Sequence, residues 1–443
     1  MSTHVSTEEL ARRAAVAAAR QQKKRQREEE QADAAPPPSF VPKSVTPFRR
    51  MIPVQPPNVS SAPCNSSTST GQSITVMTYN ILAQCLCRRE LFPYCKKDHL
   101  RVKTRFPILM REITQTLRPD VACLQEVDNF DTIVAPALRE AGYEWEYLRK
   151  SPEKEAGHGL CIAWKRDKFQ KHLYRTIFYD GHHLTHPTPI TAETRNVGQI
   201  LALKFRGEDA SASSGPDRGA PGILVSNTHL FWRAAARYEK LRQAWILINE
   251  ITAVRKDLAQ ESSLLWPTLM CGDWNSTPDD GVYKTLTKQH LSPSDLASLE
   301  PGQYVSSSSK PQPATEPKEN EAPAGEPHLL LVNPAPLSRI LDSFPTLPRL
   351  RSAYATYRPE GGEPLFTNYT NWKGTLDYVF LCEPDNVDIR LEARATKKNY
   401  KVSFTKILEL PDATHLEPGL PNSDFASDHV CLMAEVCIHP GGD

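Results

Sequence analysis

Apolar residues recur along this chain at two spacings, and the spacings predict an ordered region that mixes strands and helices. The stretch from Ile74 to Tyr79 alternates apolar and polar residues, which is typical of a strand with one buried face. Apolar residues at helical spacing, as in 101–117, predict helices. By these criteria and by short apolar runs, the predicted strands are 74–79, 121–126, 160–164, 198–205, 223–229, 267–270, 375–380 and 430–436, and the predicted helices are 101–117, 132–141 and 234–254.

The order of these elements favours an α/β fold. Strands and helices are interspersed, but several strands follow one another with no helix between them. A strict alternation of strand and helix is therefore disfavoured, and an α/β sandwich is expected.

Other stretches lack periodicity and are predicted to be disordered. Residues 34–72 are rich in Pro, Ser and Thr, and the stretches near 207–222 and 303–327 are similarly polar. The latter two are expected to be inserts in one domain, because strand-like runs flank them. Residues 7–30 predict an exposed charged helix, whose basic cluster indicates a nuclear address, an RNA-binding arm or simply a solvated surface. The expected organisation is a disordered tail over 1–73 and one folded domain over 74–443.

Charge and cysteine content narrow the class of protein. A formal net charge of +1 over 443 residues argues against a protein that coats nucleic acid, although it allows a local basic groove. Ten cysteines are scattered without metal-binding spacing, and there is no secretory segment near the start. No run of about 20 apolar residues occurs, so no membrane association is expected. We expect reduced thiols and a cytoplasmic and/or nuclear location.

One strand end carries a candidate for phosphate chemistry. An apolar run stops at Gly272, and Asp273 and Asn275 follow, two residues apart. In an extended segment both side chains would face one spot. A carboxylate that accepts a proton beside a carboxamide suits the activation of water against a phosphate. The alternative is an Asx-type turn that merely ends the strand.

Further predicted strands also begin or end at residues that bind metal or phosphate. These residues are Asn80, Glu126, His229, Asp377 and the pair Asp428 and His429. Polar groups at strand ends collect on one edge of a sheet. Unpaired buried charge is costly, so one shared site explains the set better than independent structural caps do.

The motifs that contain these residues resemble those of a known family. They are Met77–Leu82, Leu124–Glu126, Asn227–Leu230, Gly272–Pro278, Gly374–Tyr378 and Ser427–His429. In content and order they resemble the endonuclease/exonuclease/phosphatase superfamily. Within it, the chain is similar to the branch of carbon-catabolite-repressor deadenylases, nocturnin and Angel proteins, and most similar to fungal Ngl-type RNA exonucleases. The resemblance covers about 74–438.

The resemblance implies a fold and a reaction. The fold would be a four-layer α/β sandwich of the DNase I type, in which two mixed β-sheets are flanked by helices. The reaction would be Mg²⁺-dependent hydrolysis of RNA from the 3′ end, releasing nucleoside 5′-monophosphates, with Mn²⁺ as an alternative ion. A hard cation with oxygen ligands and several retained waters fits a site with few carboxylates.

The resemblance also implies roles for the residues. Glu126 would be the direct metal ligand, and Asn80, Asp377 and His429 would hold the water shell of the metal and the scissile phosphate. Asp273 would be the water-activating acid/base, and Asn275 would stabilise the transition-state oxygens. His229 would bind phosphate, and Asp428 would lie behind His429. Alternatively, His429 is the base and Asp377 orients it.

Substrate preference depends on a few further positions. Asn368 and Trp372 match residues that hold the terminal base in deadenylases, although Trp372 could instead anchor the core. Ala234 stands where deadenylases have a proline, and His158-Gly159 stands where relatives often have Asp-Gly. Both differences favour a broader exonuclease over a strict poly(A) nuclease. Four basic residues near the start of the long helix contact the RNA backbone or form a solvated face: Arg233, Arg237, Lys240 and Arg242.

The leading hypothesis is a monomeric Mg²⁺-dependent 3′→5′ exonuclease that acts on single-stranded RNA 3′ ends. Its task would be RNA 3′-end processing, for example of an rRNA precursor, or shortening of poly(A). One alternative is a phosphatase acting on a small phosphorylated dinucleotide. Another is a non-catalytic scaffold, which would require a degraded site.

Overall fold

The computed structural model describes residues 47–54, 72–151, 157–182, 192–206, 222–262, 266–301, 337–383 and 400–440. The chain divides into two compact units, Met1–Lys43 and Ser44–Asp443, and every described residue belongs to the second. The helix predicted over 7–30 lies outside the described residues. So do the two predicted inserts, except for Gly222, which begins a strand.

Two mixed β-sheets form the centre of the second unit. The larger has the order β1 (Met51–Pro53), β14 (Tyr400–Leu408), β15 (Leu432–Pro440), β2 (Gln72–Asn80), β3 (Val121–Val127), β5 (Gly159–Lys165) and β4 (Tyr143–Arg149). The smaller has the order β10 (Leu350–Ser352), β13 (Asp377–Cys382), β9 (Thr268–Asp273), β8 (Gly222–His229), β7 (Val197–Phe205) and β6 (Phe169–Phe178). In the described residues β2 with β3 and β8 with β9 are the parallel pairs, and a separate hairpin joins β11 (Asn368–Tyr369) to β12 (Lys373–Gly374).

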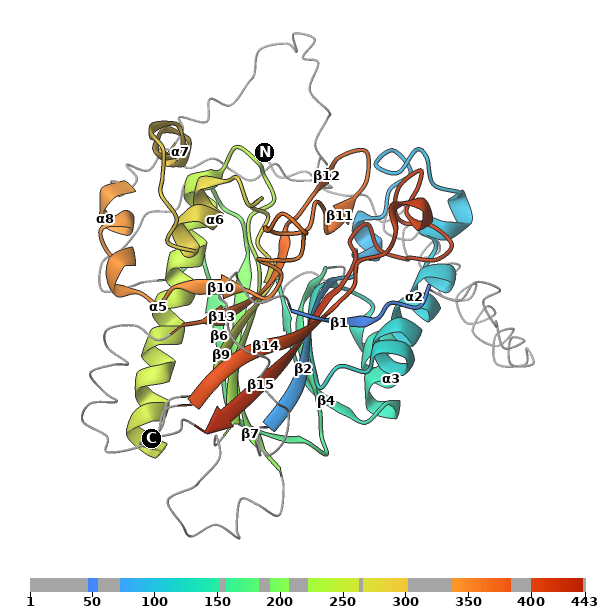
Figure 1. The fold of residues 1–443 in the computed structure, drawn as a ribbon. Coiled ribbons are helices and arrows are strands. Elements are labelled where there is room, and N and C mark those ends of the chain that lie inside the picture. The colour runs from blue at the N-terminus through green and yellow to red at the C-terminus, as the bar shows by residue number, and fades with distance from the viewer. Residues whose placement is uncertain are drawn as a thin grey trace, which may run out of the picture. The chain divides into compact units, whose positions relative to one another are not determined.

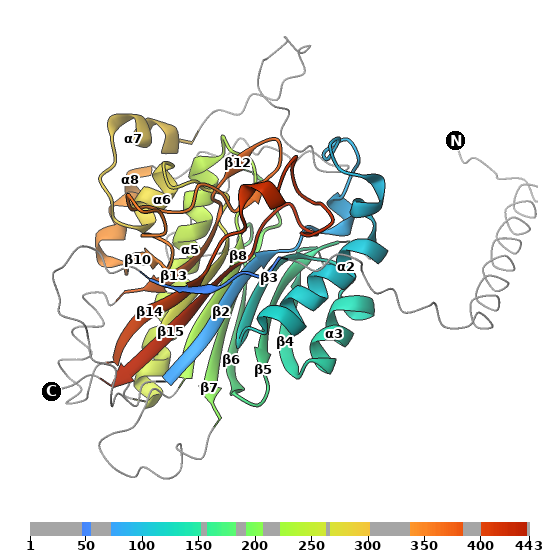
Figure 2. The ribbon, with the colours of Figure 1, turned by 45° about the vertical axis from the view of Figure 1, so that its right-hand side comes forward.

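Helices cover the outer face of each sheet (Figures 1 and 2). On the seven-stranded sheet lie α2 (Val102–Arg111), its π-helical continuation η3 (Glu112–Leu117), η4 (Phe130–Val134) and α3 (Ala135–Glu140). On the six-stranded sheet lie α5 (Arg237–Ser262), α6 (Gly281–Leu286), α7 (Pro293–Leu299) and α8 (Leu337–Leu341). Short 3-10 turns complete the described helices: η1 (Gln84–Leu86), η2 (Lys97–Leu100), η5 (Phe344–Thr346) and η6 (Ala413–His415). None of the helices in the described ranges is both long and apolar enough to cross a membrane.

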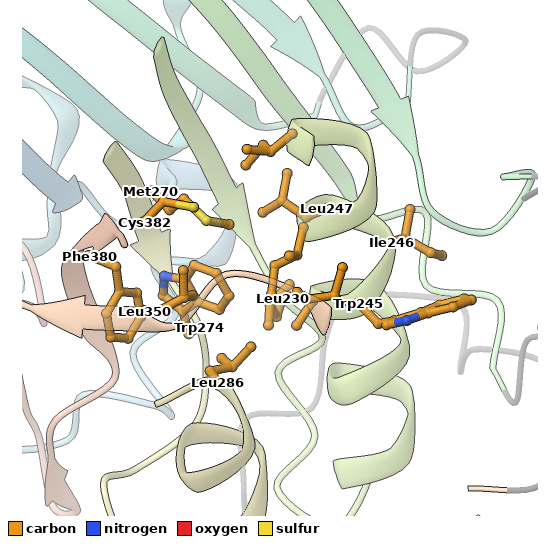
Figure 3. Packing of buried hydrophobic residues seen from close by; sticks show 14 of the residues in the cluster. Leu230, Trp245, Ile246, Leu247, Met270, Trp274, Leu286, Leu350, Phe380 and Cys382 are labelled. Atoms are coloured by element: carbon orange, nitrogen blue, oxygen red, sulfur yellow. The ribbon is translucent and has the colours of Figure 1, made fainter. Parts of the chain in front are cut away.

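Alternation of side chains along the strands divides the core into layers. In β3, Cys123 packs between the sheets, whereas Leu124 packs under α2 and α3. In β9, Cys271 faces the other sheet, and Met270 faces α5. Figure 3 shows this outer layer, where Met270 lies with residues of α5 and of neighbouring strands. The expected four-layer α/β sandwich is therefore confirmed.

The elements predicted from periodicity are present, with shifted bounds. The helix expected from Ala234 begins at Arg237, because the preceding residues form a turn in which the N–H of Ala236 donates to the carbonyl of Arg233 at 3.0 Å. Strands β4, β6 and β14 were not predicted. In β4 and β14, apolar residues alternate with charged or polar ones, the pattern of a strand with one exposed face, so the criterion used for 74–79 would have found them.

The fold begins earlier than the expected boundary at residue 73. Met51–Pro53, within the stretch predicted to be disordered, forms β1 and pairs antiparallel with β14. Just before it, Arg49 is 7% exposed, and its Nη2 lies 2.9 Å from Oε1 of Glu112. Its Nη1 donates to the carbonyl of Cys431 at 3.1 Å. This docking depends on partners far away in the chain, which local composition does not reveal.

We predict that Arg49→Ala lowers the free energy of unfolding by about 3–5 kcal/mol, because it leaves the buried Glu112 carboxylate without its cation. Urea or thermal unfolding measures the change. Arg50→Ala is the matched control, since Arg50 is exposed and its ion pair with Glu409 lies at the surface, where such pairs contribute at most about 1 kcal/mol. Equal losses for the two variants would contradict the prediction.

Candidate active site

One row of residues across the six-stranded sheet brings three predicted site residues together. His229 at the end of β8 pairs with Asp273 at the end of β9, and Asp273 pairs with Asp377 at the start of β13. Cys271 and Val379, two residues from these two carboxylates, pack between the sheets. Since alternate side chains share a face, the row points toward the other sheet.

The seven-stranded sheet contributes Asn80 and Glu126 from the neighbouring strands β2 and β3. Asn80 is four residues after Val76 in the same strand, so its side chain is on the same face, which is directed toward the other sheet. Glu126 lies where the register of β3 against β5 shifts between Leu124 and Val127, and its φ is 56°. Simple alternation from Leu124 would turn Glu126 toward the helices. The bulge instead brings Glu126 to Asn80.

The Asn80 carboxamide joins carboxylates from both sheets. Its Nδ2 donates to Oε1 of Glu126 at 3.2 Å and to Oδ2 of Asp273 at 3.0 Å. Its Oδ1 accepts the N–H of Leu82 at 3.0 Å, and Oε2 of Glu126 accepts the N–H of Ala83 at 2.9 Å. The structure therefore brings together at one edge the residues that the strand ends predicted.

His429 joins this cluster from the C-terminal motif. Its Nδ1 lies 2.7 Å from Oδ2 of Asp377, and its Nε2 lies 3.8 Å from Oδ2 of Asp273. The carboxylate that hydrogen-bonds to His429 is thus Asp377, whereas Asp428 acts on His429 through its charge. The hydroxyl of Ser427 donates to Asp428 at 3.3 Å, and the charge of Asp428 acts on Glu126.

The segment after β9 is a turn. Oδ1 of Asp273 accepts the N–H of Asn275 at 3.0 Å, and φ of Asn275 is 47°. This is the Asx-type turn considered as the alternative, and the extended geometry expected for the pair is wrong. Asn275 is held further by its own Nδ2, which donates to the carbonyl of Leu230 at 3.0 Å, and by Lys240, whose Nζ donates to the carbonyl of Asn275 at 2.6 Å.

Two of the four basic residues near the start of the long helix serve the fold. Lys240 is 2% exposed and supports Asn275, and Arg242 is fully buried with its Nη2 2.7 Å from Oε1 of Glu239. Neither an RNA contact nor a solvated face describes these two residues. Arg237 remains partly exposed and pairs with Asp280.

Burial and neighbouring charge set the protonation of the cluster. Burial, followed by the charge of Asp377, raises the pKa of Asp273 to about 7. Burial also raises the pKa of Glu126. For His429, burial lowers the pKa, but the charge and hydrogen bond of Asp377 outweigh it and bring the pKa well above 6.5. Burial holds the pKa of His229 well below 6.5. A charged and a neutral imidazole thus lie near Asp273 at neutral pH.

The donor set fits a hard divalent cation. One atom each from Asp273, Asp377 and His429 lies within 4.8 Å of the other two, and the oxygen donors among them are the two carboxylates, since a charged imidazole does not bind a metal. Oδ1 of Asp377 is buried and has no hydrogen-bond partner in the described part of the chain. Two carboxylates opposite each other on adjacent strands repel, and a cation would offset that repulsion. Glu126 and Asn80 add further oxygen ligands of the kind that Mg²⁺ and Mn²⁺ take.

The β11–β12 hairpin lies beside the cluster. Asn368 is 7% exposed, and its backbone forms an antiparallel bridge with that of His429. Trp372 is 43% exposed, and its ring covers Gly374, where even a methyl group would collide with it. The alternative that Trp372 anchors the core is therefore wrong.

Sequence reasoning missed Lys150 near the cluster, and it noted His158 only as a difference from the Asp-Gly of relatives, without a place in the site. Lys150 and His158 line a pocket that also contains His229. Lys150 follows β4, which was not predicted, so no strand end pointed to it. His158 directly precedes the predicted strand 160–164, and the criterion that found the other site residues would have found it as well.

Comparisons with known proteins agree with this geometry. The model of the Endonuclease/Exonuclease/phosphatase family matches residues 77–429. The probable RNA exonuclease NGL3 and the RNA exonuclease NGL2, both of Saccharomyces cerevisiae, are each 28% identical. Their alignments cover 85% and 83% of this chain and 79% and 78% of those proteins. The crystal structure of ANGEL2, a 2′,3′-cyclic phosphatase, has the same fold, with a TM-score of 0.60, 22% identity and coverage of 88% of this chain and 99% of that one.

We predict that Mg²⁺ raises the thermal stability of the protein. At about 100 times its dissociation constant, the ion should add about 2.7 kcal/mol to the free energy of unfolding, because it binds the folded site and not the unfolded chain. Thermal unfolding in EDTA and in excess Mg²⁺ measures the effect. Glu126→Ala should abolish most of it, and Glu144→Ala, which removes an exposed carboxylate of β4, should not. An undiminished shift in Glu126→Ala would exclude Glu126 as a ligand.

Proposed function

Because the chain belongs to the endonuclease/exonuclease/phosphatase family and is a metal-dependent nuclease or phosphodiesterase, we propose that it is a Mg²⁺-dependent 3′→5′ RNA exonuclease releasing nucleoside 5′-monophosphates. The observation that carries the proposal is the hydrogen-bonded unit of Glu126, Asn80 and Asp273, which joins the two sheets. A scaffold would tolerate loss of these groups. All of them are present, so we set the scaffold alternative aside.

Asp273 is the general base in this proposal. Its pKa of about 7 lets it take a proton from water near neutral pH. The water oxygen then attacks phosphorus, the bond from phosphorus to the 3′ oxygen of the upstream nucleotide breaks, and that oxygen leaves as a hydroxyl after protonation. Asn80 and the N–H of Asn275 hold the carboxylate in place for this transfer.

The imidazoles assist in different protonation states. His429 is charged and held by Asp377, so it donates to a phosphate oxygen as negative charge develops there. This argues against His429 as the base. His229 is neutral and would donate a hydrogen bond to the same phosphate. Mg²⁺, held by Glu126 and Asn80, would stabilise charge on the phosphate oxygens.

The surroundings of the cluster support a substrate with an unpaired terminal base. Trp372 offers an exposed ring, and an aromatic ring stacks on any base. Where deadenylases have a proline, this chain has Ala234, a small exposed residue in the turn before α5. A stack on one side only discriminates weakly among bases. We therefore propose a broad exonuclease acting on 3′ ends of single-stranded RNA in the cytoplasm or nucleus, with rRNA precursors as candidate substrates beside poly(A).

We predict that Glu126→Ala and Asp273→Ala each lower mononucleotide release from a 3′-hydroxyl RNA oligomer by at least about 10²-fold, because acid/base and metal contributions are of that size or larger. Chromatography of the products measures release, and circular dichroism checks the fold. Asp131→Ala removes an exposed carboxylate and should retain activity. Substantial activity in either site variant would refute the assignment.

Base preference has its own test. We expect poly(A) and mixed-sequence oligomers to be degraded at rates within about tenfold of each other, because one stacked base is worth only about 1–3 kcal/mol whatever its identity. Ala234→Pro should shift the preference toward adenine. Ala234 is the second residue of the turn from Arg233 to Ala236, a position that accepts proline. A strong poly(A) preference in the wild type would show that Ala234 does not set specificity.

A further inference from the structure

Beside the catalytic cluster lies a small pocket with two basic residues, Lys150 and His158, that the proposed mechanism does not use. It is lined by Lys150, His158, Gly159, Leu160, Val197 and His229. These residues come from the β4–β5 hairpin of one sheet and from β7 and β8 of the other. The pocket thus spans the two sheets at the edge that carries the site.

The backbone holds the two new basic residues opposite each other. Arg149 pairs with Gly159 in the β4–β5 ladder, and the N–H of Lys150 donates to the carbonyl of His158 at 3.0 Å. A Cβ on Gly159 would lie 2.2 Å from the carbonyl oxygen of Leu148, so only glycine permits this approach. Lys150 and His158 therefore extend the β4–β5 ladder by one backbone hydrogen bond.

Neither basic side chain has a partner within the described ranges. No ion pair or side-chain hydrogen bond of Lys150 or His158 is found there, and His158 has only a ring contact with His229. Two acids act on Lys150 through their charge, Glu126 and Asp180. Glu126 is held by Asn80 and Ala83.

Asp180 is likewise held by donors other than Lys150. Its Oδ2 accepts the N–H of Thr194 at 2.7 Å, and its Oδ1 accepts the hydroxyl of the same residue at 2.7 Å. Burial lowers the pKa of Lys150 to about 8. Burial, together with the charge of Lys150, lowers the pKa of His158 to about 3. The pocket thus contains a lysine and a neutral imidazole whose side chains hydrogen-bond to no other side chain in the described ranges.

The pocket shares His229 with the reaction centre. His229 lines the pocket, and its Nε2 lies 3.7 Å from Oδ2 of Asp273. The ring centroids of His158 and His229 are 6.5 Å apart. An anion held by Lys150 and His158 would therefore lie next to a phosphate held by His229. In a nucleic acid, the group in that position is another phosphate.

We propose that Lys150 and His158 form a subsite for a second phosphate group, adjacent to the scissile one. This inference rests on the proposed function of the catalytic cluster. The second phosphate has two candidate sources with the same chemistry. One is the phosphate on the 5′ side of the scissile linkage, and the other is a terminal phosphate on the 3′ nucleotide.

Dinucleotides separate these sources. Three substrates are compared: a dinucleoside monophosphate with hydroxyls at both ends, the same molecule with a 5′-phosphate, and the same molecule with a 3′-phosphate. We expect the wild type to cleave one of the phosphorylated forms with a kcat/KM at least about tenfold above that of the unphosphorylated form, since charge-assisted hydrogen bonds to phosphate are the stronger kind. The favoured form identifies the source.

Variants connect this preference with the pocket. Lys150→Ala and His158→Ala should each lower the preference to within about threefold of unity, while cleavage of the unphosphorylated form changes little. Lys150→Arg should retain most of the preference, because it keeps the charge. Lys204→Ala is the matched control. It removes an exposed lysine that lies near one end of β7, whereas the pocket residue Val197 lies at the other end.

The outcomes distinguish this inference from the function on which it rests. If the wild type cleaves none of the three substrates and no longer RNA, the proposed function fails. If it cleaves all three equally, the subsite is refuted while the proposed function stands. The subsite is refuted equally if a preference exists and survives in both alanine variants. The ratio of kcat/KM between phosphorylated and unphosphorylated dinucleotides is measured in the wild type, so this test does not depend on whether a variant folds.

Discussion

The structure depends on the confinement of several carboxylates in one buried place. Asp273 and Asp377 face each other across two strands, and Glu126 approaches from the other sheet. Buried like charges repel and lose hydration, so the arrangement is costly unless donors and cations compensate. The Asn80 amide, the N–H groups of Ala83 and Asn275 and the charged His429 supply part of that compensation. In the proposed mechanism, a divalent cation supplies the rest.

This cluster of carboxylates forms only if the two sheets keep a fixed separation and orientation. A buried polar bridge between them serves this purpose. Nδ2 of Asn227 in β8 donates to the carbonyls of Leu124 and Cys161 in the other sheet, and Nε2 of Gln125 donates to Oδ1 of Asn227 at 2.8 Å. Such hydrogen bonds are directional, whereas the apolar core between the sheets is not. The residues next to the site residues in sequence thus fix the distance across which the site forms.

Loops at the same edge are tied down as firmly as the strands. The guanidinium of Arg105 in α2 is fully buried and donates to the carbonyls of Ile81, Leu82 and Ala426. It therefore links the segment after Asn80 to the segment before His429. A cluster whose members come from several motifs needs this support, because an error of about 1 Å at a reacting group already costs rate.

The sequence by itself determined the strands with clear alternation, the α/β class and the strand ends at which Asn80, Glu126, His229, Asp273, Asp377 and His429 would meet. These features follow from local periodicity, and the parity of a strand decides which side chains share a face. Only the tertiary structure decided the docking of Arg49, the bulge that turns Glu126 inward, the burial of Lys240 and Arg242 and the pairing of His429 with Asp377. Each of these depends on contacts between residues far apart in the chain. The local pattern of apolar and polar positions does not determine which distant residue a charged side chain contacts.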